Sequence, residues 1–332
     1  MELELSKLWA LVRRRLRDVA VFLTLSFWIA GFIIVSLWWI TDIFLVFRWP
    51  KIAIGGLLFK LALLAVPLRI EPPGFVHRFL RFSLVAAHDY FPVNVVWEAE
   101  AKEYDEGPFV IGYEPHSVLP QGICMFSEHT EGLPKGLRNV RILASSAAFW
   151  EPVMRNMWWW WGVRPVSREC FATQLKKGRS VALCPGGVQE CLFMQPGGEV
   201  VYLKKRKGFV RMALQHGAAL VPCFAFGQSR QYKYCRIFLD WPKHVIPRAS
   251  WSSFVRRIGY VPLLISGWMG TMMPKKVAMT IVVGRLIRLP KLEEPTNEQV
   301  EKYLEQFIAA VERLFDEHKA AAGHADTELT VY

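Results

Sequence analysis

Several signatures that would assign a chemistry at once are missing from this sequence. Its six cysteines form no C-x-x-C pair and show no metal-ligand spacing, so we expect no metal site. There is no Asn-x-Ser/Thr sequon, which together with the isolated cysteines fits a catalytic part facing a reducing compartment. No G-x-S-x-G motif is present, and this argues against a serine hydrolase. Internal repeats and low-complexity linkers are also missing.

Apolar and basic residues are abundant instead. The 332 residues are 52% hydrophobic and include 14 Trp and 22 Phe, more than an ordinary cytosolic enzyme carries. The net charge is 41 − 29 = +12, which suits an anionic lipid surface or a polyanionic small molecule. Nucleic acid would match the sign, but without zinc spacing or an RNA-recognition signature we predict no nucleic-acid partner.

The first 70 residues are predicted to form a hydrophobic hairpin that anchors the chain in a membrane. Residues 19–40 carry no charge over 22 positions, about 33 Å as a helix, and follow a cluster of arginines. Residues 52–68 form a second apolar segment that contains Lys60. One crossing, two crossings and a re-entrant loop all remain open. Basic residues beyond the segment favour a return to the cytosolic side.

Residues 71–320 show the pattern of a single α/β domain. Apolar runs at 108–111, 138–143, 181–184, 219–226 and 278–283 predict buried strands. Helical stretches lie between them; one starts near Lys207 and stops at Gly217, and the last begins with a capping box from Thr296 to Gln299. Residues 321–332 are predicted to be a flexible tail. Two aromatic and methionine-rich patches, 157–161 and 265–273, predict either buried core or a lipid-facing rim.

The stretch around His116 is the first with chemical content. Residues 108–111 predict a strand, and a Glu-Pro step follows it. Ser117 is a good N-cap for a helix through residues 123–125. A helix N-terminus disfavours imidazolium, so His116 would stay neutral and could act as a general base. The competing interpretation is a histidine that only hydrogen-bonds a turn.

The second stretch, residues 181–190, repeats the pattern of an apolar strand followed by a glycine turn and a carboxylate. Gly186 and Gly187 could bring backbone N–H donors close to a ligand, as an oxyanion hole requires. We expect Glu190 to orient His116 through the second nitrogen of its ring. A covalent route through Ser117 or Cys184 is a weaker alternative.

In their order and spacing, these blocks resemble the type 2 diacylglycerol acyltransferases and their monoacylglycerol and wax-ester relatives. The resemblance runs from Asp89 to the C-terminal helix. Its blocks are Asp89-Tyr90-Phe91-Pro92, Tyr113-Glu114-Pro115-His116-Ser117, Gly162-Val163-Arg164-Pro165, Pro185-Gly186-Gly187-Val188-Gln189-Glu190, Arg206-Lys207-Gly208-Phe209, His216-Gly217-Ala218 and Val282-Val283-Gly284. It implies a glycerolipid-acyltransferase-like α/β domain behind an N-terminal membrane hairpin.

The resemblance also implies a set of site residues. Animal and fungal members read His-Pro-His-Gly where this chain reads Glu-Pro-His-Ser, as plant and algal members do, so His116 is the histidine to carry over. Related acyltransferases place an Asp five positions after that histidine, and this chain has Gln121 there. Either Glu190 or Glu114 must then orient His116, and we favour Glu190. Candidates for substrate contact, including the coenzyme A phosphates, are Ser117, Arg168, Arg206, Lys207, Gly208 and Phe209. The basic residues among them could instead grip anionic lipid.

The resemblance predicts transfer of a fatty acyl group from acyl-CoA to diacylglycerol, with acyl-CoA as a co-substrate and no cofactor. Monoacylglycerol or a fatty alcohol is the alternative acceptor. The expected location is the endoplasmic reticulum membrane, or lipid droplets, with the catalytic domain in the cytosol and phospholipid as a partner. A homo-oligomer remains open. The alternative outside enzymes is a lipid-droplet scaffold without turnover.

Overall fold

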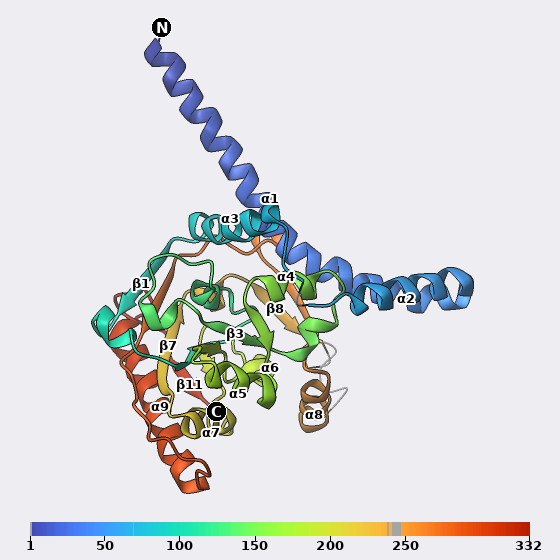
Figure 1. Ribbon diagram of the computed structural model, residues 1–332. Helices are drawn as coiled ribbons and strands as arrows, with labels where there is room; N and C mark the ends of the chain where they lie inside the picture. The colour runs from blue at the N-terminus through green and yellow to red at the C-terminus, as the bar shows by residue number, and fades with distance from the viewer. Residues whose placement is uncertain (1, 69, 238, 241–246) are drawn as a thin grey trace.

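A seven-stranded sheet forms the centre of the α/β body (Figure 1). The computed structural model describes residues 2–68, 70–237, 239–240 and 247–332. The strand order is β1-β10-β7-β2-β5-β3-β4; β7 and β10 run antiparallel, and the other neighbours run parallel. The strands are β1 (Val93–Trp97), β2 (Phe109–Glu114), β3 (Arg141–Ala144), β4 (Val163–Pro165), β5 (Val181–Leu183), β7 (Ala219–Phe226) and β10 (Met279–Val283). The α/β class is confirmed.

The central strands are continuous apolar runs because both faces of the sheet are covered. Every residue of β2 is buried. Its Val110 packs on one face among side chains of α5 (Arg168–Lys176), α7 (Gly208–His216) and α9 (Asn297–His318). Its Ile111 packs on the other face in a core that includes α3 (Gly74–Tyr90) and α4 (Met154–Trp160). Two-sided burial explains why apolar runs predicted these strands.

Local sequence signals also placed two helix ends correctly. Thr296 and Gln299 form the predicted capping box at the start of α9. Gly217 ends α7 in the left-handed region at φ 64°. The sequence missed the edge strands β1 and β4 and two small sheets. One small sheet pairs β6 (Glu199–Val201) with β11 (Leu329–Val331), and the other pairs β8 (Lys233–Arg236) with β9 (Leu263–Ser266).

The last residues are not the flexible tail that the sequence predicted. Strand β11 pairs in parallel with β6, and the backbone N–H groups of Leu203 and Lys204 donate to the Tyr332 carbonyl at 2.9 and 2.8 Å. The Tyr332 ring lies 4.7 Å from that of Phe193. Apolar side chains and a free strand edge on β6 thus anchor a segment that looks polar and short in sequence.

Two N-terminal helices extend beyond the body, α1 (Glu2–Arg48) and α2 (Pro50–Ala65) (Figure 1). Helix α2 packs back against the end of α1, where Lys60 is fully buried and its Nζ donates to Asp42 Oδ2 at 2.5 Å and to the Trp38 carbonyl at 2.7 Å. Within the described residues, none of the helices combines the length and the apolar character that a membrane crossing needs. The predicted membrane hairpin is therefore not confirmed.

The two patches rich in Trp and Met have different surroundings. Trp158 on α4 and Trp161 directly after it pack against Trp28 of α1, with ring centroids 4.9 and 4.2 Å from that of Trp28. This patch is largely core and holds α1 on the body. In the second patch, Met269 is 79% exposed, and Trp268 lies edge-on to the exposed Phe22 of α1. The first patch is therefore core, whereas the second is exposed, and its contact with lipid stays a prediction.

Candidate active site

The predicted chemical residues gather at the carboxyl ends of three neighbouring strands, β2, β5 and β7. β2 pairs in parallel with both β5 and β7, so the segments that follow these strands meet at one edge of the sheet. His116 follows β2, the glycine turn follows β5, and Gln228 follows β7. Parallel pairing brings together residues that are over 70 positions apart in sequence.

The loop after β2 does not continue into the predicted helix. Ser117 takes a left-handed backbone conformation at φ 55°, and a 3₁₀ helix begins only at Gln121, ending at Phe126. Pro120 is the residue that precedes it, and Ser117 caps nothing. The argument that a helix starting at Ser117 keeps His116 neutral is therefore wrong, because no α-helix follows Ser117 in this loop.

The surroundings of the His116 ring define which nitrogen can act as a base. Nδ1 lies 2.9 Å from the Ser117 carbonyl oxygen and 3.5 Å from Cys191 Sγ, and the Cys191 thiol itself donates to that carbonyl at 3.3 Å. A carbonyl only accepts, so Nδ1 carries the proton and Nε2 holds the lone pair of the neutral ring. Nε2 has no hydrogen-bond partner within the described part of the chain.

Glu190 reaches His116, but not through the ring as predicted. One carboxylate oxygen accepts from the backbone N–H of His116 and, at 3.3 Å, from that of Ser117. The other accepts from the Tyr202 N–H at 3.2 Å. Glu190 thus fixes the path of the backbone that carries the imidazole, while the ring is oriented by the Ser117 carbonyl.

Glu114 and Glu190 form a buried acid pair, and both side chains are fully inaccessible. Glu114 accepts from the Gly186 N–H at 3.2 Å, and its second oxygen meets no protein donor in the described structure. Burial, and then the charge of Glu190, raises the pKa of Glu114 well above its usual value. Burial also raises the pKa of Glu190, although the hydrogen bonds from the His116 and Tyr202 N–H groups lower it in part. Burial therefore favours the protonated form of Glu114, and a hydrogen bond between the two carboxyl groups contributes to the pKa of both.

The sequence predicted that Gly186 and Gly187 both donate N–H groups to an oxyanion, but the two glycines differ in the structure. The Gly186 N–H is already bonded to Glu114, and a Cβ on Gly186 would collide with the Glu190 carboxylate. Gly186 is thus a glycine because an acid occupies the space beside it. Gly187 begins α6 (Gly187–Cys191) with φ 55°. Its N–H has no acceptor among the described residues and remains a candidate donor.

The residues predicted to contact substrate lie in different places. Arg206 donates to the carbonyls of Pro185 at 2.5 Å and Gly186 at 3.0 Å, so it clamps the glycine turn. Lys207 forms an ion pair with Glu301. Phe209 is buried in the core, 5.0 Å from the Phe307 ring, and is not a substrate contact. Ser117 is buried in the loop beside the histidine, while Arg168 and Gly208 are exposed at the starts of α5 and α7.

Gln228 is a site residue that the sequence did not reveal. It is 1% exposed, its Nε2 donates to the Pro115 carbonyl at 2.7 Å, and its Oε1 accepts from Tyr113 Oη at 2.8 Å and the Gly122 N–H at 3.1 Å. It therefore supports the histidine loop from the side opposite Glu190 in the strand order. The available signal was its position directly after the long apolar run of β7.

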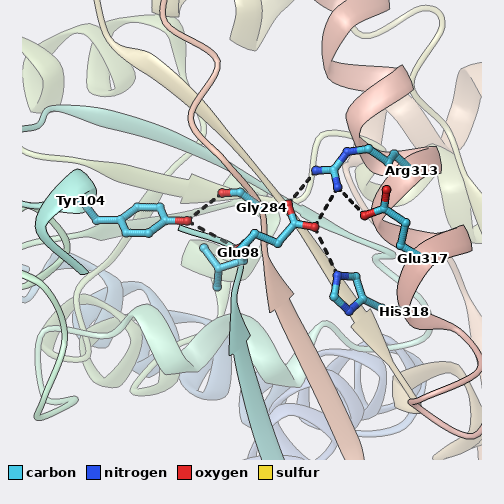
Figure 2. Close-up of polar contacts among 7 residues, drawn as sticks. Glu98, Tyr104, Gly284, Arg313, Glu317 and His318 are labelled. Atoms are coloured by element: carbon cyan, nitrogen blue, oxygen red, sulfur yellow. Dashed lines mark hydrogen bonds and ion pairs between the residues drawn. The ribbon is translucent and has the colours of Figure 1, made fainter. Parts of the chain in front are cut away.

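A second cluster of titratable groups lies away from this site, where the end of β1 meets α9 (Figure 2). Glu98, Glu317 and His318 bring ligand atoms within 4.8 Å of one another. However, Arg313 donates to both Glu98 oxygens, at 2.8 and 2.6 Å, and also to Glu317 at 2.6 Å. The positive guanidinium occupies the position that a cation would need. This cluster clasps α9 to the sheet and does not suit a metal.

Comparison with known proteins is consistent with this arrangement. The sequence model of the diacylglycerol acyltransferase family matches residues 72–332. Diacylglycerol O-acyltransferase 2 of Xenopus tropicalis is 33% identical over 263 residues, covering 73% of this chain and 68% of the relative. The human 2-acylglycerol O-acyltransferase 3 is 33% identical over 260 residues, covering 73% of each chain.

Among solved structures, that of the 1-acyl-sn-glycerophosphate acyltransferase from Thermotoga maritima aligns with 92% of this chain and 99% of its own. The TM-score is 0.43 and the identity 16%, so the likeness is slight. The sequence matches are the informative ones: they span the whole α/β body, with every residue of the acid pair and the histidine loop inside them. This protein belongs to the diacylglycerol acyltransferase family.

Proposed function

We propose that this chain transfers a fatty acyl group from acyl-CoA to the free hydroxyl of diacylglycerol, forming triacylglycerol, with His116 as the general base. The observation that carries the proposal is the hydrogen bond from His116 Nδ1 to the Ser117 carbonyl. It leaves Nε2 as the unprotonated nitrogen on a ring that is half-buried rather than sealed in the core.

In the proposed reaction, His116 Nε2 accepts the hydroxyl proton while the hydroxyl oxygen attacks the thioester carbonyl. The tetrahedral intermediate then expels the coenzyme A thiolate, and the imidazolium returns the proton to that sulfur. No acyl-enzyme, metal or cofactor is needed. The Gly187 N–H is the available donor for the oxyanion, and one such donor contributes about 3–4 kcal/mol in comparable sites. Glu190, Glu114 and Gln228 position the loop and take no proton from the substrate.

The acceptor is the least constrained part of the proposal. Diacylglycerol is favoured by the family match and by relatives named diacylglycerol O-acyltransferase 2. One equally similar relative is named 2-acylglycerol O-acyltransferase 3, which supports monoacylglycerol as the alternative acceptor. A fatty alcohol is the third candidate from the sequence resemblance.

We further propose that the enzyme works on a phospholipid membrane, at the endoplasmic reticulum or on lipid droplets, with the α/β body in the cytosol. Large apolar side chains on α1 and α2 are strongly exposed; Phe44 is 71% and Phe47 86% exposed. On the body, Met269 is also exposed, and the neighbouring Trp268 packs edge-on against the exposed Phe22 of α1. Surfaces of this kind mark contact with lipid or with another protein.

The decisive experiment compares two histidine variants. Microsomes containing the full chain are given labelled oleoyl-CoA and diacylglycerol, and triacylglycerol is measured. We expect His116→Ala to lower synthesis by about 10²–10⁴-fold, the usual contribution of a general base. His216→Ala is a matched control, because its Nδ1 also lies 2.9 Å from a backbone carbonyl, that of Met212, but at the end of α7.

Two results would contradict the proposal. Equal triacylglycerol synthesis by His116→Ala and the unchanged protein would remove His116 as the base. Absence of turnover by the unchanged protein, with normal association with lipid droplets, would favour the scaffold alternative. Supplying monoacylglycerol and a fatty alcohol in parallel assays identifies the acceptor.

A further inference from the structure

A cavity of about 580 Å³ lies beside the histidine loop. Pro115 and Ser117, the two neighbours of His116, form part of its wall. The remaining wall comes from the loop before β6, from β6 itself, from the segment leading into β8, and from the stretches before β10 and β11. Segments spread over the whole α/β body therefore converge on one hollow next to the proposed base.

The wall of this cavity is rich in cations without acidic partners. Arg230, Lys233 and Lys275 all line it. In the part of the chain that the structure describes, neither lysine forms an ion pair, and Arg230 donates only to Thr327 Oγ1 at 3.3 Å through its side chain. Three cations in one wall leave a net positive potential that a bound anion would neutralise.

The one acid in the wall is Glu199, which is 2% exposed. The Ser229 hydroxyl donates to it. Burial raises the pKa of Glu199 to about 7, so near neutral pH a large share of this carboxyl is protonated. Glu199 therefore opposes the positive potential of the cavity less than a fully ionised carboxylate would.

We propose that this cavity binds the phosphate groups of acyl-CoA through Arg230, Lys233 and Lys275. This inference rests on the proposed use of acyl-CoA as the donor. Because Pro115 and Ser117 flank His116 and line the cavity, phosphates bound there would lie close to the histidine loop. Two of the basic residues predicted from sequence are less suited, because Arg206 is bonded to the glycine turn and Lys207 to Glu301.

The test uses coenzyme A itself, so it does not depend on turnover. Full-length protein in detergent is titrated with coenzyme A, and the dissociation constant is compared with that for pantetheine, which lacks the phosphates. We expect the double variant Lys233→Gln/Lys275→Gln to bind coenzyme A about tenfold or more weakly, since hydrogen bonds to charged groups are lost. Pantetheine binding stays unchanged, and the apparent KM for oleoyl-CoA rises in parallel with little change in kcat.

Lys276→Gln is the matched control, because Lys276 is exposed and directly follows Lys275 but does not line the cavity. His116→Ala separates the two proposals: it should lose turnover and keep coenzyme A binding. If His116→Ala keeps its turnover while the double variant still binds coenzyme A weakly, the base assignment fails and the phosphate site stands.

Anionic lipid is the other source of phosphate, and a vesicle arm distinguishes it. Binding to phosphatidylcholine vesicles with and without phosphatidylserine is measured for the same variants. Unchanged coenzyme A affinity in the double variant would overturn the proposal, and a selective loss of phosphatidylserine binding would reassign the cavity to lipid head groups. Equal weakening by Lys276→Gln would also overturn it, because a general surface charge would then explain the effect.

Discussion

Two buried carboxylates, Glu190 and Glu98, show how the same side chain serves different purposes in two regions of this protein. Glu190 is surrounded by backbone N–H groups and by a second acid, Glu114. Glu98 is bonded to the guanidinium of Arg313 and to His318 (Figure 2). Burial raises the pKa of Glu190; at Glu98 burial acts in the same direction, but Arg313 and His318 overcome it and lower the pKa.

The difference separates two kinds of cluster. The one around Glu190 positions the proposed base, and the one around Glu98 joins two elements of the fold. The Glu98 carboxylate is neutralised by Arg313, and this ion pair joins the end of β1 to α9. Glu190 instead accepts hydrogen bonds from backbone N–H groups and lies against Glu114. These contacts shape the loop that carries His116. Perturbed acids beside a cavity are functional candidates, whereas perturbed acids in ion pairs are commonly structural.

The largest effect is expected when the space beside Glu190 is filled. In Gly186→Ala the new Cβ collides with the Glu190 carboxylate and displaces the loop. We expect a loss of about 1–3 kcal/mol of unfolding free energy, with activity falling even in the folded fraction. Gly74→Ala at the start of α3 is the control, since nothing lies within 4 Å of its Cβ position. Thermal unfolding and triacylglycerol synthesis are measured together, and equal behaviour of the two variants would contradict the crowding argument.

The acid pair itself is tested by amides. Glu114→Gln should keep most activity, because the amide oxygen can accept from Gly186 and the amide nitrogen can donate to Glu190 in place of the acid proton. Glu190→Gln should lower activity by about tenfold to a hundredfold, since an amide nitrogen would face an N–H donor. Kinetics on both variants give the answer. The reverse ranking would show that Glu190, and not Glu114, holds the proton.

The smallest effect concerns pH. The lowered pKa of Glu98 means that its stabilisation is present above its unfolded-state pKa and is lost as pH falls through the folded value. The raised pKa values of Glu114 and Glu190 act oppositely: their stabilisation is present at low pH and is lost as pH rises through the folded values.

Unfolding midpoints against pH should therefore separate the two regions. Glu98→Gln should reduce the loss of unfolding free energy at acid pH by about 1 kcal/mol. The figure is modest because Arg313 is 38% exposed. Glu114→Gln should reduce the loss of stability that occurs as pH rises. A change on the same side for both variants would show that the two carboxyl groups do not differ as described.

Several features followed from the sequence because their causes are local. The strands at 181–183 and 219–226 are apolar runs buried on both faces, and the capping box at Thr296 needs only residues within one helical turn. The tail failed as a prediction because its partner, β6, lies over 120 positions earlier in the chain. The helix expected after Ser117 failed because two prolines, Pro115 and Pro120, and the left-handed backbone of Ser117 compete with it.

For the site, the sequence by itself determined which motifs are candidates: His116, Glu114, Gly186, Gly187 and Glu190 lie in segments whose residue types could carry the proposed chemistry. Only the tertiary structure decided which of these residues are hydrogen-bonded to one another. It bonded Glu190 to the backbone of His116, gave the Gly186 N–H to Glu114, and brought Gln228 beneath the loop. The physical reason is that hydrogen bonds depend on the direction of individual atoms, which parallel strand pairing sets and residue spacing along the chain does not.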